Sequence, residues 1–173
     1  EIEKSGAKAV ALKLDVADSH SFPAFAEQVK THLQTIWQRD SFDYLLNNAG
    51  VGVHASFAET TEAQFDQLMN IHLKGVFFLT QALHGMLTAS AAGGQRAKVI
   101  NIASIDGQSV NPWETYSYAA SKAGVIHLSK RMALRLIQDG IVVNAICPGP
   151  FASEMNKDAR DNAERQHHSS CRA

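Results

Sequence analysis

Short apolar runs alternate along this chain with longer stretches in which apolar residues recur every three or four positions. The apolar runs lie at residues 9–14, 44–46, 98–103 and 141–146. The longer stretches lie at residues 22–37, 60–86 and 114–138. The first pattern is typical of buried strands and the second of amphipathic helices. Because strands that are joined through a helix pair in parallel, the pattern predicts an α/β protein: a doubly wound parallel sheet with helices on both faces.

The two ends of the chain depart from this alternation. Residues 1–5 have the composition of the last turn of a helix that stops at Gly6, and no initiator Met precedes them. Residues 156–173 are almost wholly polar and have no apolar face. We therefore expect one domain over residues 1–155, a poorly ordered polar tail over residues 156–173, and a chain that is a fragment of a longer one.

Composition limits the function classes. Sixteen Lys and Arg against seventeen Asp and Glu give a formal charge of −1, whereas nucleic-acid binders carry a basic surplus. No apolar run approaches the roughly 18 residues that a membrane span needs. Cys147, Cys171 and the eight histidines show no metal-site spacing. We expect no nucleic-acid partner, no membrane contact and no metal, and, because no secretory signal is present, a cytoplasmic location.

Polar or glycine-containing clusters follow the predicted strands. They are Asp15, Asn47–Gly50, Ser104 and Pro148–Gly149. Parallel sheets bind ligands beyond the carboxyl ends of their strands, so we expect the binding site at this edge. Each cluster alone keeps a second interpretation. Asp15 either accepts from an adenine amino group or caps a turn, and Asn47–Gly50 either contact a ribose or form a plain turn. Pro148–Gly149 either lead Ser153 to a carboxamide or phosphate or form only a rigid loop.

Tyr118 and Lys122 are one helical turn apart in the stretch at 114–138, so they project from the same face. A nearby ammonium stabilises a phenolate and lowers the pKa of the tyrosine. Such a phenol can give a proton to a carbonyl oxygen or take one from an alcohol. Ser104, at the end of the preceding strand, is positioned to hydrogen-bond the same oxygen. The pair alone is also compatible with ordinary surface packing.

Together these motifs resemble one family. The matching residues are Asp15-Val16, Asn47-Asn48-Ala49-Gly50, Ser104 with Gly107, Tyr118-Ala119-Ala120-Ser121-Lys122, and Asn144 leading to Pro148-Gly149 and Ser153. Their order and spacing over residues 1 to about 155 resemble the short-chain dehydrogenase/reductase family. The stretch from Val99 to Met155 is most similar to its 3-oxoacyl-carrier-protein-reductase-like members.

The resemblance implies a Rossmann-type domain that binds NAD(H) or NADP(H) and transfers a hydride between the nicotinamide and a carbonyl/alcohol substrate. In this family pattern Tyr118 is the general acid/base, Lys122 lowers its pKa and holds the nicotinamide ribose, and Ser104 orients the substrate oxygen. The implied cofactor-binding residues, apart from Tyr118 and Lys122, are Asp15 and Val16 at the adenine, Asn47, Ala49 and Gly50 along the adenosine ribose, and Pro148, Gly149, Phe151 and Ser153 at the nicotinamide.

The sequence also departs from the family pattern. The opening strand, the Gly-rich pyrophosphate turn T-G-x-x-x-G-x-G and the second strand of the family have no counterpart here. We therefore expect an incomplete Rossmann-type fold with sharply reduced cofactor affinity. The same missing segment distinguishes NAD from NADP in the family. The tail from Asn156 resembles neither the substrate-covering helical segment nor the seventh strand of the family.

His72 stands where the family usually has an asparagine that helps to hold a water in the proton relay to the lysine. Asn70 lies two residues earlier, about 200° around the helix, and cannot simply substitute. Histidine also hydrogen-bonds water, so either His72 serves in the relay or the relay is impaired.

Three interpretations follow. The first is an NAD(P)-dependent oxidoreductase acting on a small carbonyl or alcohol. The second is a truncated, catalytically inactive chain that keeps part of the fold. The third is an interaction module that uses the two long helices, which in this family commonly form a four-helix dimer interface. By resemblance we expect a homodimer or homotetramer.

Overall fold

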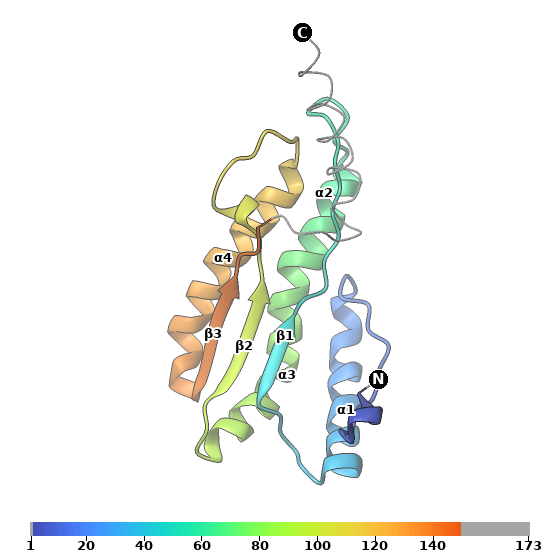
Figure 1. Cartoon of the computed structure of the whole chain (residues 1–173), viewed down its shortest axis with the longest axis vertical. Coiled ribbons are helices and arrows are strands. Elements are labelled where there is room, and N and C mark those ends of the chain that lie inside the picture. The colour runs from blue at the N-terminus through green and yellow to red at the C-terminus, as the bar shows by residue number, and fades with distance from the viewer. Residues whose placement is uncertain (1, 150–173) are drawn as a thin grey trace.

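Three parallel strands form the sheet of this protein in the order β1-β2-β3 (Figure 1). The computed structural model describes residues 2–149. The strands are β1 (Tyr44–Asn47), β2 (Ala97–Ile102) and β3 (Ile141–Ile146). In register, Leu45 lies opposite Val99, which lies opposite Val143. The predicted parallel α/β sheet, an incomplete Rossmann-type fold, is confirmed. The predicted tail over residues 156–173 lies outside the described residues.

Within residues 2–149, three long helical segments alternate with the strands: the first precedes β1, the second joins β1 to β2, and the third joins β2 to β3. The first is α1 (Phe22–His32), continued by a π turn over Leu33–Trp37. The second consists of α2 (Glu62–Met69), the π turn η4 (Asn70–Lys74) and α3 (Gly75–Ala92). The third is α4 (Tyr116–Leu136), followed by a 3-10 turn over Ile137–Asp139. Two further 3-10 turns are η2 (Ser19–Ser21) and η5 (Ile105–Gly107).

The start of the second segment shows why the chain becomes helical there. Thr61 is the N-cap of α2 and its side chain accepts from the backbone N–H of Gln64, whose own side chain accepts from the N–H of Thr61. This reciprocal capping box satisfies two donors that a helix start leaves free. The helical stretch predicted over residues 60–86 therefore begins within one residue of its expected start and runs past Met86 to Ala92.

Residues 9–14 do not form the strand that their apolar composition predicts. They carry no regular secondary structure, and the segment lies beside α1, away from the strands (Figure 1). A strand needs a neighbour for its backbone N–H and C=O groups. No described segment pairs with this one, and Leu14 packs instead against the cluster between α1 and α3. At the N-terminal end, Glu3–Ser5 form a 3-10 turn before Gly6, whose φ is +82°.

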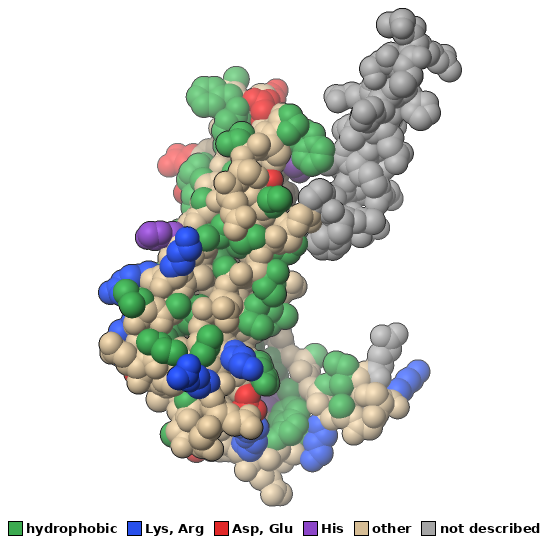
Figure 2. Space-filling model, turned by 60° about the vertical axis from the view of Figure 1, so that its left-hand side comes forward, with side chains coloured by type: hydrophobic (Ala, Val, Ile, Leu, Met, Phe, Trp, Pro, Cys, Tyr) green, Lys and Arg blue, Asp and Glu red, His purple; other side chains and the backbone are tan. Residues whose placement is uncertain are grey.

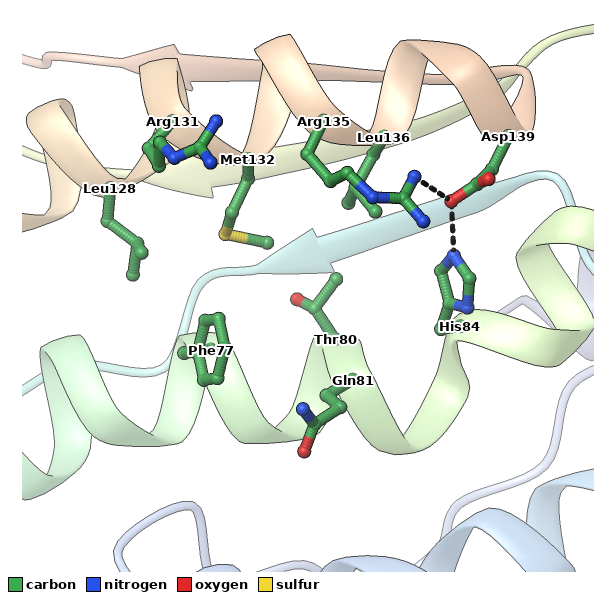
Figure 3. A pocket seen from close by; sticks show the side chains of 10 residues that line it. All are labelled: Phe77, Thr80, Gln81, His84, Leu128, Arg131, Met132, Arg135, Leu136 and Asp139. Carbon is green, nitrogen blue, oxygen red and sulfur yellow. Dashed lines mark hydrogen bonds and ion pairs between the residues drawn. The ribbon is translucent and has the colours of Figure 1, made fainter.

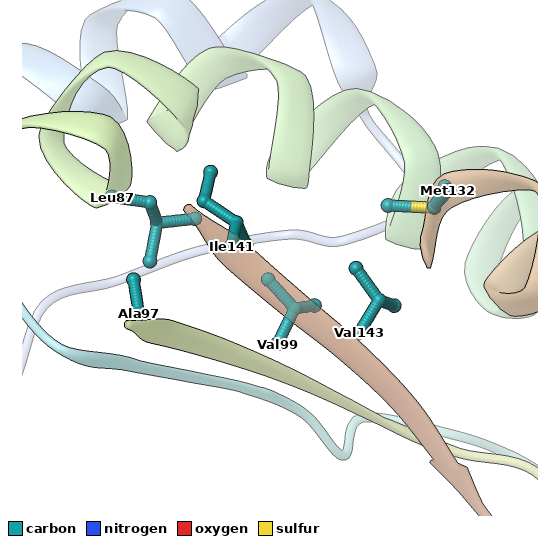
Figure 4. Packing of buried hydrophobic residues seen from close by; sticks show 6 residues of the cluster. All are labelled: Leu87, Ala97, Val99, Met132, Ile141 and Val143. Atoms are coloured by element: carbon teal, nitrogen blue, oxygen red, sulfur yellow. The ribbon is translucent and has the colours of Figure 1, made fainter. Parts of the chain in front are cut away.

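The helices of the described residues cover one face of the sheet. Side chains on that face pack against α3 and α4 in a buried cluster (Figure 4). Its members are Leu87, Ala97, Val99, Met132, Ile141 and Val143. A second cluster, centred on Phe22, Leu79 and Leu83, joins α1 to α3. The expected cover of helices on both faces is thus absent within residues 2–149.

The other face of the sheet is open. Tyr44 and Leu46 of β1 are 62% and 57% exposed, and Ile146 of β3 is 49% exposed. On the side that carries β3 and α4, hydrophobic side chains lie exposed between Lys and Arg side chains (Figure 2). None of the helices within residues 2–149 combines the length and hydropathy that a bilayer span requires.

Candidate functional site

A cleft of about 580 Å³ lies at the carboxyl ends of the three strands. Its walls come from the loop after β1, the end of β2 with η5, the loop before α4, the first turns of α4 and the residues after β3. Eight of the predicted site residues line it: Ala49, Gly50, His72, Ser104, Tyr118, Lys122, Pro148 and Gly149. Residues separated by up to a hundred positions in the sequence therefore meet at the edge where parallel sheets bind ligands.

Ser104 is placed by the turn that follows β2. Its backbone is extended, and its Oγ accepts from the N–H of Asp106, which caps η5. A Cβ at Gly107 would stand 2.6 Å from the backbone of Lys122 and Ala123. Only glycine therefore lets η5 rest on the backbone of α4, and this contact sets Ser104 beside the helix that carries Tyr118 and Lys122.

Lys122 is a buried cation at the floor of the cleft. Its side chain is 4% exposed, and Nζ donates to the carbonyl oxygen of Ile102 at 2.8 Å. Burial lowers its pKa to about 8. No carboxylate of the described residues lies within ion-pair distance of Nζ. An ammonium has three donors, so Lys122 keeps donors that a ligand in the cleft can use.

Tyr118 lies beside Lys122 but is not acidified in this structure. Nζ of Lys122 is 5.6 Å from the centre of the phenol ring. Burial raises the pKa of Tyr118, the Ser104 hydroxyl lowers it, and the charge of Asp106 raises it again. The expected lowering of this pKa by the lysine is therefore not seen, because Nζ is turned towards Ile102 and burial dominates.

His72 lies in the π turn η4 and is 1% exposed. Its Nε2 is 3.1 Å from the backbone nitrogen of Val51, and its Nδ1 is 2.8 Å from Oγ of Ser121. Burial, and next the charge of Lys122, lower its pKa to about 4. The ring is therefore neutral at pH 7.

Asn47 does not line the cleft, in contrast to its predicted contact with the cofactor. Its Nδ2 donates to Oδ1 of Asn101 at 2.8 Å and to Oγ1 of Thr80 at 3.2 Å. Asn101 in turn donates to Oγ of Ser129 at 2.8 Å. This closed network links β1, β2, α3 and α4 inside the core. The neighbouring Asn48 lines the cleft in its place.

Asp15 and Val16 lie outside the lining of the cleft. Oδ1 of Asp15 accepts from the N–H of Ala17 at 2.9 Å, so the turn-capping interpretation of Asp15 is confirmed. A Cβ at Gly75 would stand 2.5 Å from the carbonyl oxygen of Val16, so this segment rests on the start of α3. Their contact with an adenine stays a prediction. Phe151 and Ser153 lie outside the described residues.

The outer wall of the cleft contains residues that the sequence analysis did not single out. Asp106 accepts from Nδ2 of Asn111 at 2.5 Å and from Oγ1 of Thr115 at 3.4 Å, and so holds the loop that carries Trp113. Tyr116 packs edge-on against Phe57 and does not line the cleft. In the sequence, this wall is marked only by a polar loop between the strand predicted at residues 98–103 and the helix predicted at residues 114–138. No cluster within residues 2–149 has three His, Cys, Asp or Glu side chains grouped to hold a metal.

A second cavity, of about 360 Å³, separates α3 from α4 (Figure 3). At one end Asp139 accepts from Nε2 of His84 at 2.9 Å and from a guanidinium nitrogen of Arg135 at 2.8 Å. The pKa of Asp139 is lowered by the hydrogen bond from His84 and by Arg135. Phe77 and Leu128 line the apolar part of the cavity.

Comparison with known proteins decides the family. Residues 1–164 match the family described as short chain dehydrogenase. The chain belongs to the short-chain dehydrogenase family. A 3-oxoacyl-(acyl-carrier-protein) reductase of Staphylococcus aureus is 32% identical over 166 residues, which cover 96% of this chain and 63% of the relative. This short-chain dehydrogenase chain thus spans less than two thirds of the length of that curated relative.

Solved structures of the family have the same fold. A gluconate 5-dehydrogenase of Burkholderia cenocepacia, in complex with NADP and tartrate, superposes with a TM-score of 0.82 at 28% identity, over 94% of this chain and 60% of that one. A 3-oxoacyl-(acyl-carrier-protein) reductase of Brucella melitensis, in complex with NAD, gives a TM-score of 0.82 at 26% identity, over 95% of this chain and 63% of that one. The predicted membership in the short-chain dehydrogenase family is confirmed.

Proposed function

We propose that this short-chain dehydrogenase chain carries the active-site half of an NAD(P)-dependent oxidoreductase that acts on a small carbonyl or alcohol. The observation that supports the proposal most is the buried ammonium of Lys122, which lies without a carboxylate partner among the described residues in the cleft that also contains Tyr118 and Ser104. Burying an uncompensated cation destabilises a fold. A ligand with hydroxyl or phosphate oxygens is the natural compensation. The similar proteins in complex with NADP and with NAD agree with that ligand class.

The residues of the cleft fit the nicotinamide half of such a cofactor. The spare donors of Lys122 suit the ribose hydroxyls, and Gly149 leaves open space for a close approach. Ala49 and Pro148 complete this side of the cleft. A bound nicotinamide supplies or accepts the hydride. The chain itself supplies position and the proton.

The proton belongs to Tyr118. Because burial raises its pKa, the phenol is protonated at neutral pH and can donate to a carbonyl oxygen. Oγ of Ser104 accepts from Asp106, which leaves its own hydrogen free to bind the same oxygen. This assignment favours reduction of a carbonyl at neutral pH.

Two measurements test the proposal. Titration of the chain with NADH and with NADPH, followed by cofactor fluorescence, should show binding. Tyr118→Phe should keep that binding and lose about 10²- to 10⁴-fold in turnover, the range for removal of a general acid. Full turnover in Tyr118→Phe would remove Tyr118 from the mechanism. Absence of binding at millimolar cofactor would favour the truncated, inactive interpretation.

We also propose that the chain self-associates through α3 and α4 as a homodimer or homotetramer. The cavity between these helices is open, and Phe77, Phe78 and Leu134 are 37%, 40% and 69% exposed. Light scattering tests this. A dimeric mass for the wild type and a monomeric mass for Phe78→Glu is the expected result. A monomeric wild type would contradict the proposal.

A further inference from the structure

The imidazole of His72 is held at both ring nitrogens by two different parts of the chain. Nε2 lies 3.1 Å from the backbone nitrogen of Val51, in the loop after β1, and Nδ1 lies 2.8 Å from Oγ of Ser121 on α4. A backbone N–H can only donate, so Nε2 carries the lone pair and Nδ1 carries the proton. Ser121 then accepts from His72 and donates to the carbonyl oxygen of Tyr118 at 2.8 Å. Donor and acceptor are therefore fixed for each of the three hydrogen bonds that run from Val51 through His72 and Ser121 to Tyr118.

We propose that His72 is a positioning residue, whose neutral ring ties the loop over residues 48–54 to α4 and so fixes the wall of the cleft beside Tyr118 and Lys122. The inference rests on the proposed function in that this loop lines the proposed nicotinamide cleft. It gives His72 a different task from the water-holding role that the family resemblance implies. One nitrogen already accepts from Val51 and the other already donates to Ser121, so neither is left for a relay water.

The surroundings of the ring leave it little freedom. A Cβ at Gly50 would stand 3.2 Å from Nε2 of His72 and 3.7 Å from Nζ of Lys122, so the loop approaches both side chains closely. The ring meets Tyr118 edge to face, with centroids 5.6 Å apart. A proton on Nε2 would remove the acceptor of Val51 and put a second cation beside Lys122. Burial, and next the charge of Lys122, lower the pKa of His72.

The hydrogen bonds can be observed directly in the full chain, without cofactor. In ¹⁵N-labelled protein at pH 7, NMR should show His72 as the Nδ1–H tautomer. It should also show a scalar coupling across the hydrogen bond between the amide nitrogen of Val51 and Nε2. An Nε2–H tautomer at His72 would overturn the proposal.

Three variants test the tether, by which we mean the hydrogen bonds of His72 that join the loop over residues 48–54 to α4. His72→Phe keeps an aromatic ring but has no acceptor, so the Val51 amide should exchange with solvent about tenfold faster. His72→Gln can accept from Val51 and donate to Ser121, and should restore the wild-type rate to within about threefold. The amide of Val99 in β2 is the internal control and should be unchanged. If His72→Phe does not fold, Ser121→Ala replaces it and should speed exchange at Val51 through loss of the tautomer preference.

An unchanged rate at Val51 in a folded His72→Phe would refute the tether. The result is independent of catalysis, because exchange and tautomer are measured without cofactor or turnover. Failure of NADH and NADPH to bind would therefore refute the proposed function and leave the tether intact. In a chain that does bind cofactor, recovery of binding by His72→Gln but not by His72→Phe would identify the tether as the feature that the cleft requires.

Discussion

At the scale of single residues, two groups among the buried polar side chains have different consequences: a network in the core, and the single side chain of Lys122 in the cleft. Asn47, Thr80, Asn101 and Ser129 satisfy one another within the core. Lys122 instead has a single carbonyl partner among the described residues and faces a cleft. A closed network stabilises the fold that it belongs to, whereas a cation with spare donors is available to a ligand. The first group should therefore respond to mutation in stability and the second in binding.

The closed network predicts the effect of Asn47→Ala. Loss of the amide leaves Oδ1 of Asn101 buried without its donor, so the free energy of unfolding should fall by about 2 kcal/mol. Urea denaturation measures this. Asn144→Ala, at an exposed position of β3, is the matched control and should change the free energy of unfolding by less than about 0.5 kcal/mol. Equal effects in the two variants would show that the network contributes nothing.

The neutral state of His72 predicts a dependence of stability on pH. Its pKa is about 4 in the folded chain against 6.5 ordinarily, so between these values the unfolded chain binds more protons. The stabilisation is complete above pH 6.5 and is lost as the pH falls towards 4, by roughly 3 kcal/mol in all. His72→Gln should abolish this loss, and His20→Gln, at an exposed position, should keep it. Urea denaturation at pH 7, 5.5 and 4.5 provides the comparison.

Residue type alone did not separate these two groups, because Asn47 and Lys122 both occupy motif positions. What distinguishes Asn47 is register: it lies opposite Asn101 on the face that the helices cover. Register is set by strands that are far apart in the sequence, so a motif cannot reveal it. The meeting of Ser104, Tyr118 and Lys122 was predictable for the opposite reason, since strand ends and one helical turn fix their places.

At the scale of elements, the periodicity of apolar residues predicted α1, the segment from α2 to α3, α4 and the three strands. It failed at residues 9–14, because apolar composition marks a buried segment but a strand also needs a hydrogen-bonding neighbour. The periodicity also gave no sign of the π turn η4. At the end of this turn, the backbone N–H of Gly75 donates to the carbonyl oxygen of Asn70. Such turns shift a helix by one residue and depend on tertiary contacts.

The contact between η5 and α4 predicts different results for two glycine substitutions. Gly107→Ala puts a Cβ 2.6 Å from the backbone of Lys122 and Ala123, so η5 must move and the free energy of unfolding should fall by about 1–3 kcal/mol. Gly85→Ala, on α3, meets nothing within 4 Å and should raise the free energy of unfolding by up to about 1 kcal/mol. Thermal or urea denaturation checks both signs. A destabilised Gly85→Ala would contradict the argument.

At the scale of the whole molecule, helices cover only one face of the sheet within residues 2–149, whereas helices on both faces were expected. The central strand β2 pairs with a neighbour on each side, whereas β1 and β3 each have one. In a parallel strand successive amides point to alternate sides. Amides on both sides of β2 therefore face a neighbouring strand, but alternate amides of β1 and β3 face away from the sheet.

This arrangement predicts the pattern of amide exchange over the sheet. Consecutive amides of β2 from residue 98 to residue 102 should all be protected, while protection in Tyr44–Asn47 and Ile141–Ile146 should alternate from one residue to the next. Hydrogen exchange followed by NMR resolves single amides and tests this directly. Uniform protection along β1 would mean that another segment covers its free edge.

The amide pair in the core also has a consequence for how the strands align. Tyr44, Leu45 and Leu46 are apolar on both faces of β1, so hydrophobicity alone distinguishes poorly between neighbouring alignments of β1 on β2. A shift of β1 by one position would move Asn47 to the open face of the sheet. The side-chain amide of Asn101 would then stay in the core without its hydrogen-bond partner, which would destabilise the fold by about 1–3 kcal/mol. The two asparagines thus select a single register of β1 on β2. That register also determines where the loop that contains Gly50 lies relative to Lys122.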